Sequence, residues 1–336
     1  MKNLRQDYYN PFFSHIYVEK AIQDHHRTKR ILQRFPHATI VSIDHYKDVF
    51  CRKSQDFILQ QQAQNLILGQ KQGNLIYEGA PVCQSFGNEN FYYTSCIMNC
   101  IYDCEYCYLK GMYPSGNLVI FVNLEDFFAE VTEKLKKHPF YLCISYDTDL
   151  MAMEAVAGYV REWTLFAGRH ENLTMEIRTK CANRAFFEQA GQAPGVIFAF
   201  TLSPQELICA YEHGAPSLES RISCAALAVE RGFAVRLCFD PVLYCSGWET
   251  YYDEMLSRVF EEIDMERIRD VSVGTFRISK DYLKKMRKSE PFSAVAQFPY
   301  QNDHGVCRYD KELAERMERF VTERLRERLP ERKIFL

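Results

Sequence analysis

Short apolar runs alternate with amphipathic stretches along most of this chain. From residue 91 onward, several runs each precede a stretch with helical spacing of apolar residues, among them LVIFV, PFYLCIS, TMEIRT, VIFAFTL, FAVRLCFDPVL and DVSVGTF. Such runs predict strands, and apolar residues three and four positions apart predict helices. We expect the helices to begin near residues 124, 151 and 279 and to cover residues 182–189, 204–211, 217–231 and 248–263.

The chain before about residue 84 predicts a smaller lobe. HIYVEKA and ATIVSID predict strands, and DHHRTKRILQRF between them predicts a charged helix. The stretch QDFILQQQAQNLILGQKQGN is polar with spaced apolar residues, which predicts a helix followed by a turn. At the other end, YDKELAERMERFVTERLRERLPERKIFL predicts a charged helix and a last short strand.

Strands that alternate with helices predict parallel strands joined by crossover helices. The number of units indicates an α/β fold built on a partial (β/α)6-type barrel. We expect a small N-terminal α/β lobe (1–84), the barrel (85–300) and a C-terminal helical and hairpin extension (301–336). Barrels of this kind bind ligands at the C-terminal ends of their strands.

Composition narrows the class of protein. Apolar residues make up 47% of the chain, which is enough for a full core, and the net charge is −3. This charge argues against binding to nucleic acid through bulk charge, although a local basic groove is compatible with it. We find no apolar run of membrane-spanning length and no signal-peptide core in MKNLRQDYYNPFF, so we expect a cytoplasmic protein without a membrane partner.

The chain contains thirteen cysteines, an odd number with scattered spacing. In a cytoplasmic protein this pattern favours reduced core cysteines plus one metal site over a disulfide framework.

One loop concentrates the cysteines. It contains Cys100-Ile-Tyr-Asp-Cys104-Glu-Tyr-Cys107, a C-x3-C-x2-C pattern. Three thiolates leave a four-iron cluster one ligand short, and the open iron can chelate a small molecule. Structural zinc normally needs four protein ligands, and the loop offers no tidy second pair. Cys96 lies four residues earlier, so a set of Cys96, Cys100 and Cys104 stays an alternative, although the tight final spacing favours the later triad.

The C-x3-C-x2-C motif resembles that of the radical S-adenosylmethionine (SAM) superfamily. The resemblance implies a radical SAM barrel and a 4Fe-4S cluster held by Cys100, Cys104 and Cys107. It also implies SAM as the second cofactor, whose cleavage yields a 5′-deoxyadenosyl radical.

Further segments occur in the same order as in spore photoproduct lyase and resemble that family over most of the chain. The matching segments are Cys104-Glu-Tyr106-Cys107-Tyr108-Leu109, Val122-Asn-Leu-Glu125, Cys143-Ile-Ser145, Arg178-Thr-Lys180, Phe200-Thr201, Glu212-His-Gly-Ala-Pro-Ser217 with Arg221, Asp240-Pro-Val242, Gly247-Trp-Glu249 and Thr275-Phe-Arg277. Several fall at the ends of predicted strands, where a barrel binds its ligands.

The resemblance implies a reaction and catalytic residues. In that family the deoxyadenosyl radical takes a hydrogen from spore photoproduct, a thymine dimer, and the methylene bridge then breaks. Cys143 would return a hydrogen to the product radical, and Tyr106 and Tyr108 would help to restore the cycle. A thiol suits this step because its S–H bond is weak and its sulfur polarizable. Without the resemblance, a small buried hydrophobe would be the usual role of such a cysteine.

The resemblance also implies contacts to SAM. Lys180 would pair with the SAM carboxylate, and Tyr108, Ser145 and Thr201 would supply polar contacts. From the residues alone, Lys180 would be a surface lysine that follows a strand, and each hydroxyl would be a satisfied core group.

The implied partners are DNA with a damaged thymine pair and an electron donor such as flavodoxin or ferredoxin. Arg277 and Arg308 would contact the substrate, and Tyr309 would stack on a base. The alternative for Arg308 and Tyr309 is that they belong to an ordinary polar turn before the last helix. Here Cys307 replaces an aromatic residue of the family, and Phe276 replaces a histidine.

Three hypotheses follow. The chain is a spore photoproduct lyase, a diverged radical SAM enzyme that acts on another nucleic acid or a small molecule, or a non-enzymatic metal-binding or redox module.

Overall fold

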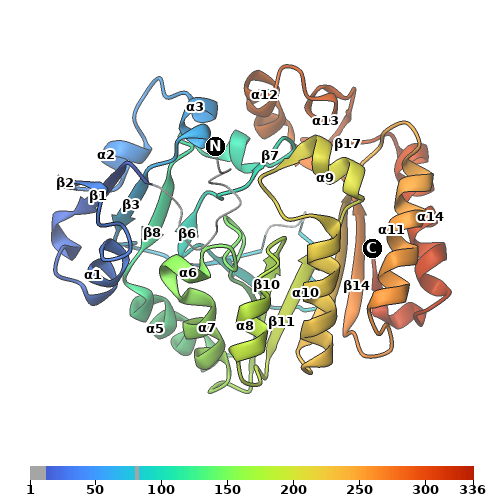
Figure 1. The fold of residues 1–336 in the computed structure, drawn as a ribbon, viewed down its shortest axis with the longest axis horizontal. Helices are drawn as coiled ribbons and strands as arrows, with labels where there is room; N and C mark the ends of the chain where they lie inside the picture. Colours follow the sequence, from blue (N-terminus) through green and yellow to red (C-terminus); the bar gives the residue numbers. More distant parts are fainter. Residues whose placement is uncertain (1–12, 80–82) are drawn as a thin grey trace. The chain divides into compact units, whose positions relative to one another are not determined.

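The computed structural model describes residues 13–79 and 83–336 (Figure 1). The chain divides into two compact units: Met1–Tyr102 with Met112–Ile177, and Asp103–Gly111 with Arg178–Leu336. The cysteine loop is therefore shared, because Cys100 belongs to the first unit and Cys104 and Cys107 to the second. The three predicted parts, 1–84, 85–300 and 301–336, stay a prediction.

The first unit contains a five-stranded sheet with the order β2-β1-β3-β8-β6. Its strands are β1 (His15–Glu19), β2 (Thr39–Ile43), β3 (Leu66–Gly69), β8 (Leu118–Phe121) and β6 (Ile97–Met98). Neighbouring strands are parallel except β6, which is antiparallel to β8. The helical segments around this sheet are η2 (Lys20–Ile22), α1 (His26–Leu32), α2 (Lys47–Phe50), α3 (Phe57–Gln62) and α5 (Leu124–Leu135).

One predicted element in this unit is wrong. The stretch after α3 was expected to continue as helix and turn, but Leu66–Gly69 forms β3 between β1 and β8. All four residues are buried. A strand buried on both faces is a continuous apolar run, and its pattern does not distinguish it from a buried helical segment.

The first unit also contains the strand that carries Cys143. The strand order here is β4-β5-β9-β10, with β4 (Ile76–Glu78), β5 (Phe91–Thr94), β9 (Phe140–Cys143) and β10 (Leu173–Thr179). The pairs β5–β9 and β9–β10 are parallel, and β4–β5 is antiparallel. The connection from β9 to β10 contains α6 (Glu154–Ala157) and α7 (Tyr159–Ala167), which confirms the predicted strand–helix–strand order.

The second unit contains parallel strands in the order β11-β13-β14-β18. They are β11 (Val196–Thr201), β13 (Ala234–Val242), β14 (Asp270–Thr275) and β18 (Ile334–Phe335). The helical segments are α8 (Arg184–Gln189), α9 (Gln205–Tyr211), α10 (Leu218–Glu230), α11 (Trp248–Glu262), α12 (Lys280–Ser289), α13 (Ala294–Gln297), α14 (Lys311–Arg326) and η3 (Glu331–Lys333). Helices α10 and α14 pack against β13 and β14 (Figure 1).

Helices α8, α9, α10, α11 and α12 begin within two residues of their predicted starts, whereas the short α13 was not predicted. The side chains of Asn183, Ser217, Ser279 and Asp310 each accept a hydrogen bond from a backbone N–H in the first turn of α8, α10, α12 and α14. Such caps satisfy N–H groups that have no partner within the helix, so they fix where each helix starts.

Two small antiparallel sheets add to this arrangement. Strand β7 (Asp103–Cys104) pairs with β12 (Glu212–His213), and β15 (Arg277–Ser279), β17 (Val306–Arg308) and β16 (Gln301–Asp303) form the order β15-β17-β16. The β16–β17 hairpin falls in the predicted C-terminal hairpin extension, whereas the pairing of β7 with β12 and of β15 with β17 was not predicted. The short helix α4 (Leu109–Met112) follows the cysteine loop. Within residues 13–79 and 83–336, no helix has the length and apolar character needed to cross a membrane.

Candidate active site

The second half of the cysteine loop is fixed to the segment that follows α9. Cys104 lies opposite Glu212 in the β7–β12 ladder. The backbone N–H of Glu105 donates to the carbonyl of Tyr211 over 2.9 Å, and the Glu105 carboxylate lies 2.9 Å from Nε2 of His213. The loop is thus held by backbone pairing on both sides of Cys104.

The end of the loop is fixed to α12. The buried ammonium of Lys110 lies 2.7 Å from the Asp103 carboxylate and also pairs with Glu290, just after α12. Gly111 lies against the backbone of Tyr282, because a Cβ atom at this position would be 2.4 Å from the Tyr282 carbonyl oxygen. Any larger residue at position 111 would push the loop away from the helix.

A buried carboxylate joins the loop to the rest of the second unit. Glu212 is 2% exposed and accepts hydrogen bonds from the Tyr106 hydroxyl, the Arg221 guanidinium and the Ser203 hydroxyl, the last over 3.1 Å. The Lys180 ammonium lies 3.6 Å from the same carboxylate. We call these five residues the Glu212 network.

The charges of this network are strongly coupled. Burial alone would raise the pKa of Glu212, but Arg221 and Lys180 outweigh it and lower the pKa to about 2. Burial opposes the charge of Lys180, but Cys104, Glu212 and Tyr106 outweigh it and raise the pKa of Lys180 well above its ordinary value. Glu212 is therefore a carboxylate and Lys180 an ammonium in the folded protein.

Lys180 also faces the cysteine loop. Its Nζ atom lies 3.7 Å from Sγ of Cys104 and 3.2 Å from the hydroxyl of Tyr106. Burial raises the pKa of Cys104 to about 12, and the Lys180 ammonium opposes this shift by favouring the thiolate, which is the form that binds metals.

The loop residues fit an iron–sulfur cluster. In the first unit, the backbone N–H of Tyr102 donates to Sγ of Cys100 over 3.4 Å. Iron–sulfur clusters are held by thiolates, and hydrogen bonds to their sulfurs tune the cluster. The pKa does not separate this triad from the alternative set with Cys96, because burial raises the pKa of Cys96 and of Cys104 alike to about 12.

The other two residues predicted to bind SAM in the second unit differ in exposure. Thr201 is buried at the end of β11, and its carbonyl accepts a hydrogen bond from Arg221 over 3.2 Å. Tyr108 is half-buried just before α4, and its carbonyl accepts from Gly111 N–H over 2.9 Å. The structure thus brings Lys180 and Tyr106 together and anchors Thr201 through Arg221.

Cys143 and Ser145 lie in the first unit. Cys143 is the last residue of β9 and is 7% exposed, with Tyr93 of β5 and Glu176 of β10 beside it in the sheet. Ser145 is equally buried. Cys143 therefore sits at the C-terminal end of a parallel strand, the edge where this class of fold binds ligands.

Asp147 was not singled out from the sequence. It is buried, and its carboxylate accepts hydrogen bonds from the Ser95 and Tyr113 hydroxyls, the latter over 2.6 Å. Burial raises the pKa of Asp147 in spite of these donors and of Lys71. The sequence feature that could have identified Asp147 is its position four residues after Cys143, in the loop that follows β9.

The residues predicted to contact the substrate lie on or beside the β15-β17-β16 sheet. Arg277 and Arg308 are directly opposite each other, and they pair with Asp240 (3.1 Å) and Asp303 (2.8 Å). Tyr309, in contrast, is 1% exposed, and its hydroxyl accepts a hydrogen bond from the backbone N–H of Tyr244. Its ring packs against Phe298 and Tyr300, so the structure places Tyr309 in the core and not on a surface.

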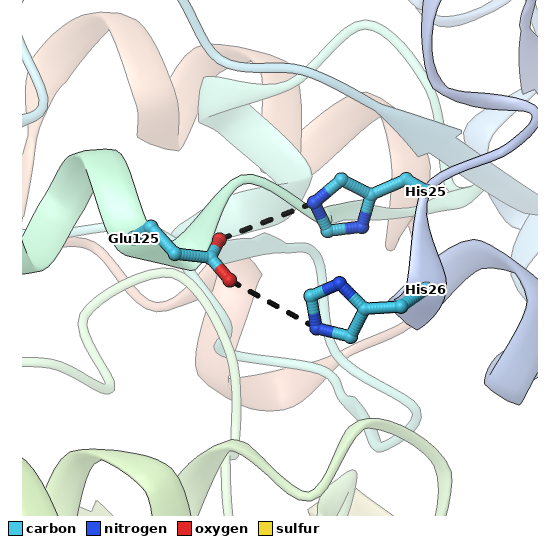
Figure 2. Close-up of side chains that lie close together, drawn as sticks. All are labelled: His25, His26 and Glu125. Carbon is cyan, nitrogen blue, oxygen red and sulfur yellow. Dashed lines mark ion pairs between the residues drawn. The ribbon is translucent and has the colours of Figure 1, made fainter.

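A separate group in the first unit resembles a metal site. His25, His26 and Glu125 direct their nitrogen and oxygen atoms toward one another, with N–O distances of 4.0 and 3.9 Å (Figure 2). However, the Arg27 guanidinium lies 2.6 Å from both oxygens of Glu125, and Nδ1 of His25 accepts a hydrogen bond from the backbone N–H of Arg27. A neutral His25 ring then carries its proton on Nε2, which faces Glu125, so we interpret the group as an Arg27–Glu125 ion pair flanked by two histidines and not as a metal site.

Comparison with known proteins decides the family. The family model described as spore photoproduct lyase matches residues 88–334. The chain belongs to the spore photoproduct lyase family. A spore photoproduct lyase of Clostridium acetobutylicum is 22% identical over 237 residues, which cover 67% of this chain and 70% of the relative. The Bacillus subtilis enzyme is 22% identical over 176 residues, about half of each chain.

Solved structures of spore photoproduct lyase have the same fold. A double mutant with bound AdoMet and dinucleoside spore photoproduct superimposes with a TM-score of 0.81 at 17% identity, over 96% of this chain and 98% of that chain. A complex with dinucleoside spore photoproduct gives a TM-score of 0.80 at 16% identity, over the same shares. These matches confirm the predicted fold class, an α/β radical SAM partial barrel.

Family membership confirms three further predictions. The chain is an enzyme of the radical SAM lyase class, and its cofactors are SAM and a 4Fe-4S cluster. The alternative of a non-enzymatic metal-binding module is not supported.

The Glu212 network yields a stability prediction. Glu212→Gln removes the carboxylate that pairs with both Lys180 and the fully buried Arg221. We expect a loss of about 3–5 kcal/mol in the free energy of unfolding, measured by denaturant titration of the protein without cofactors. Glu219→Gln is the matched control, because this carboxylate pairs with Arg258 on the surface and should cost about 1 kcal/mol or less. Equal losses in the two variants would contradict the role of the network.

Proposed function

We propose that this enzyme repairs spore photoproduct, a damaged thymine pair in DNA, in the cytoplasm. The observation that carries the proposal is the family match over residues 88–334, which spans every residue that we assign to the site. Relatives with this fold have been solved with AdoMet and with the dinucleoside lesion. The chain's own loop and the Glu212 network supply the chemical groups that such a reaction needs.

Cys100, Cys104 and Cys107 would hold the cluster, and Lys180, Tyr108, Ser145 and Thr201 would bind SAM. When bound, the two cofactors supply a 5′-deoxyadenosyl radical. Lys180 is suited to a carboxylate ligand because the Glu212 network keeps it protonated while its Nζ atom still faces Cys104. The positive charge of Lys180 would therefore stabilise both the Cys104 thiolate and the SAM carboxylate.

Cys143 would return a hydrogen atom to the product radical. Its burial excludes water from the thiol, and its place at the end of β9 orients it through the sheet. Of the two predicted tyrosines, Tyr106 is held through its hydroxyl by Glu212. This bond fixes the phenol for its assigned part in restoring the cycle.

Arg277 and Arg308 would contact the phosphates that flank the lesion. Guanidinium groups suit this task because they bind phosphate through paired hydrogen bonds. The buried position of Tyr309 removes it from base stacking in this conformation.

A second candidate function keeps the chemistry and changes the substrate. Cys307 is 5% exposed and lies opposite Ile278 and Asn302, so the residue that replaces a family aromatic is turned into the structure. An altered substrate segment favours a different lesion or a small molecule. Either substrate requires a one-electron donor, for which we propose a flavodoxin or ferredoxin.

Turnover of a defined substrate tests the proposal. Anaerobic protein with a reconstituted cluster, dithionite, SAM and a spore-photoproduct dinucleotide should release the repaired thymine dinucleotide, measured by chromatography. Cleavage of SAM without repair would reject this substrate and favour the second candidate.

Replacement of Cys143 tests the hydrogen donor. Cys143→Ala should still cleave SAM but should divert the substrate radical to by-products, because no thiol quenches it. Cys238→Ala is a matched control, since Cys238 is also a buried strand cysteine, inside β13. An unchanged product distribution in Cys143→Ala would refute the donor role.

A further inference from the structure

Helix α12 carries an unusual concentration of positive charge. Its sequence, KDYLKKMRKS, contains five cationic residues and one acidic residue. Lys280, Lys284 and Lys288 are spaced four residues apart, so they form one stripe along the helix, and Lys285 lies beside it. All four lysines are exposed. Within residues 13–79 and 83–336, no carboxylate lies within ion-pair distance of any of them.

The stripe has no structural role that the fold explains. Like charges four residues apart destabilise a helix, and no described carboxylate forms an ion pair with these lysines. The helix is instead held by the opposite side, where Leu283 and Met286 are buried, and by the Ser279 cap. The chain as a whole has a net charge of −3, so this positive surface is local.

The inner side of α12 contacts the cysteine loop. The Tyr282 backbone packs on Gly111, and the Glu290 carboxylate pairs with Lys110. The backbone N–H of Lys110 donates to the carbonyl of Cys107 over 3.1 Å. One continuous chain of contacts therefore joins the basic helix to a predicted cluster ligand, all within the second unit.

An exposed aromatic side chain follows the same helix. Phe292 lies three residues after the end of α12 and is 98% exposed. A single exposed apolar side chain is common on protein surfaces. Phe292 adds to the lysines an aromatic side chain of the kind that is enriched in protein interfaces.

We infer that α12 and Phe292 form the docking surface for an acidic one-electron carrier protein. The inference rests on the proposed function, which consumes an electron supplied from outside. Transfer oxidises the carrier by one electron and reduces the cluster by one, with no bond made or broken. Redox partners of this kind form small, transient complexes that complementary charge steers together. The lysines of α12 supply the positive charge that attracts an acidic carrier, and the contact of α12 with the cysteine loop places that charge near the predicted cluster.

Nucleic acid is the other polyanion that such a surface would attract. Two observations favour the carrier protein. The stripe consists of lysines, which act as point charges for long-range steering, whereas the paired guanidiniums suited to phosphate lie on β15 and β17. The contacts of α12 lead to the cluster loop.

Direct binding tests the inference without turnover. The probe is a purified acidic flavodoxin, and its affinity for the holoenzyme is measured by calorimetry at low and high salt. Lys284→Glu/Lys285→Glu/Lys288→Glu should weaken binding by about tenfold or more at low salt and abolish most of its salt dependence. Lys53→Glu/Lys136→Glu/Lys137→Glu changes the net charge equally on exposed residues of the first unit and should bind as wild type does.

Three companion measurements separate the possible outcomes. Flavodoxin-driven SAM cleavage should fall in the α12 variant, whereas dithionite-driven cleavage should stay at the wild-type rate. Phe292→Ala should weaken flavodoxin binding with little change in its salt dependence. Flavodoxin affinity equal to wild type in the α12 variant would overturn the inference, as would a selective loss of affinity for a thymine-rich oligonucleotide. Absence of dithionite-driven cleavage in the wild type would instead reject the proposed function, and the binding measurement would still decide the docking surface.

Discussion

A buried carboxylate must be paired, and the second unit of this enzyme is organised around one. Glu212 is surrounded by Arg221, Lys180, Tyr106 and Ser203, which come from four different parts of the chain. Removing the carboxylate takes the common partner away from two buried cations, at a cost of about 3–5 kcal/mol. The network therefore specifies one arrangement of β12, the cysteine loop, the end of β10 and α10.

The same constraint prepares the chemistry. Because Glu212 holds Lys180 in its charged form, an ammonium stays beside the sulfur of Cys104. Because Glu212 also accepts the hydrogen bond of Tyr106, the phenol next to Cys107 has a fixed orientation. The loop that carries these residues is anchored at its other end by Lys110 and α12. A site that handles radicals benefits from groups held by packing and hydrogen bonds in advance of the substrate.

Much of this organisation could be predicted from the sequence, and the exceptions have physical causes. The alternation of strands and helices and the spacing of Cys100, Cys104 and Cys107 are local patterns, and they predicted the fold class and a candidate metal loop. Strand β3 was missed because an apolar run buried on both faces has no period that marks it as a strand. The short pairings β7–β12 and β15–β17 were missed because two or three residues carry too little pattern.

Side-chain environments were the least predictable feature. Glu212 and Arg221 both belong to a segment that resembles a family motif. Their pairing, however, depends on a turn between α9 and α10 that no local pattern specifies. Tyr309 was expected at a surface, and only the packing of Phe298 and Tyr300 reveals that it belongs to the core. The lysines of α12 show the converse, since a charged stripe is evident in the sequence but its contact with the cysteine loop is not.

The central claim is that three cysteines hold a cluster with one iron left open for SAM. Electron paramagnetic resonance of the anaerobically reconstituted, reduced protein, recorded with and without SAM, tests it most directly. We expect a reduced 4Fe-4S signal whose shape changes when SAM is added. A protein that holds zinc without sulfide, or a cluster signal that SAM leaves unchanged, would contradict it.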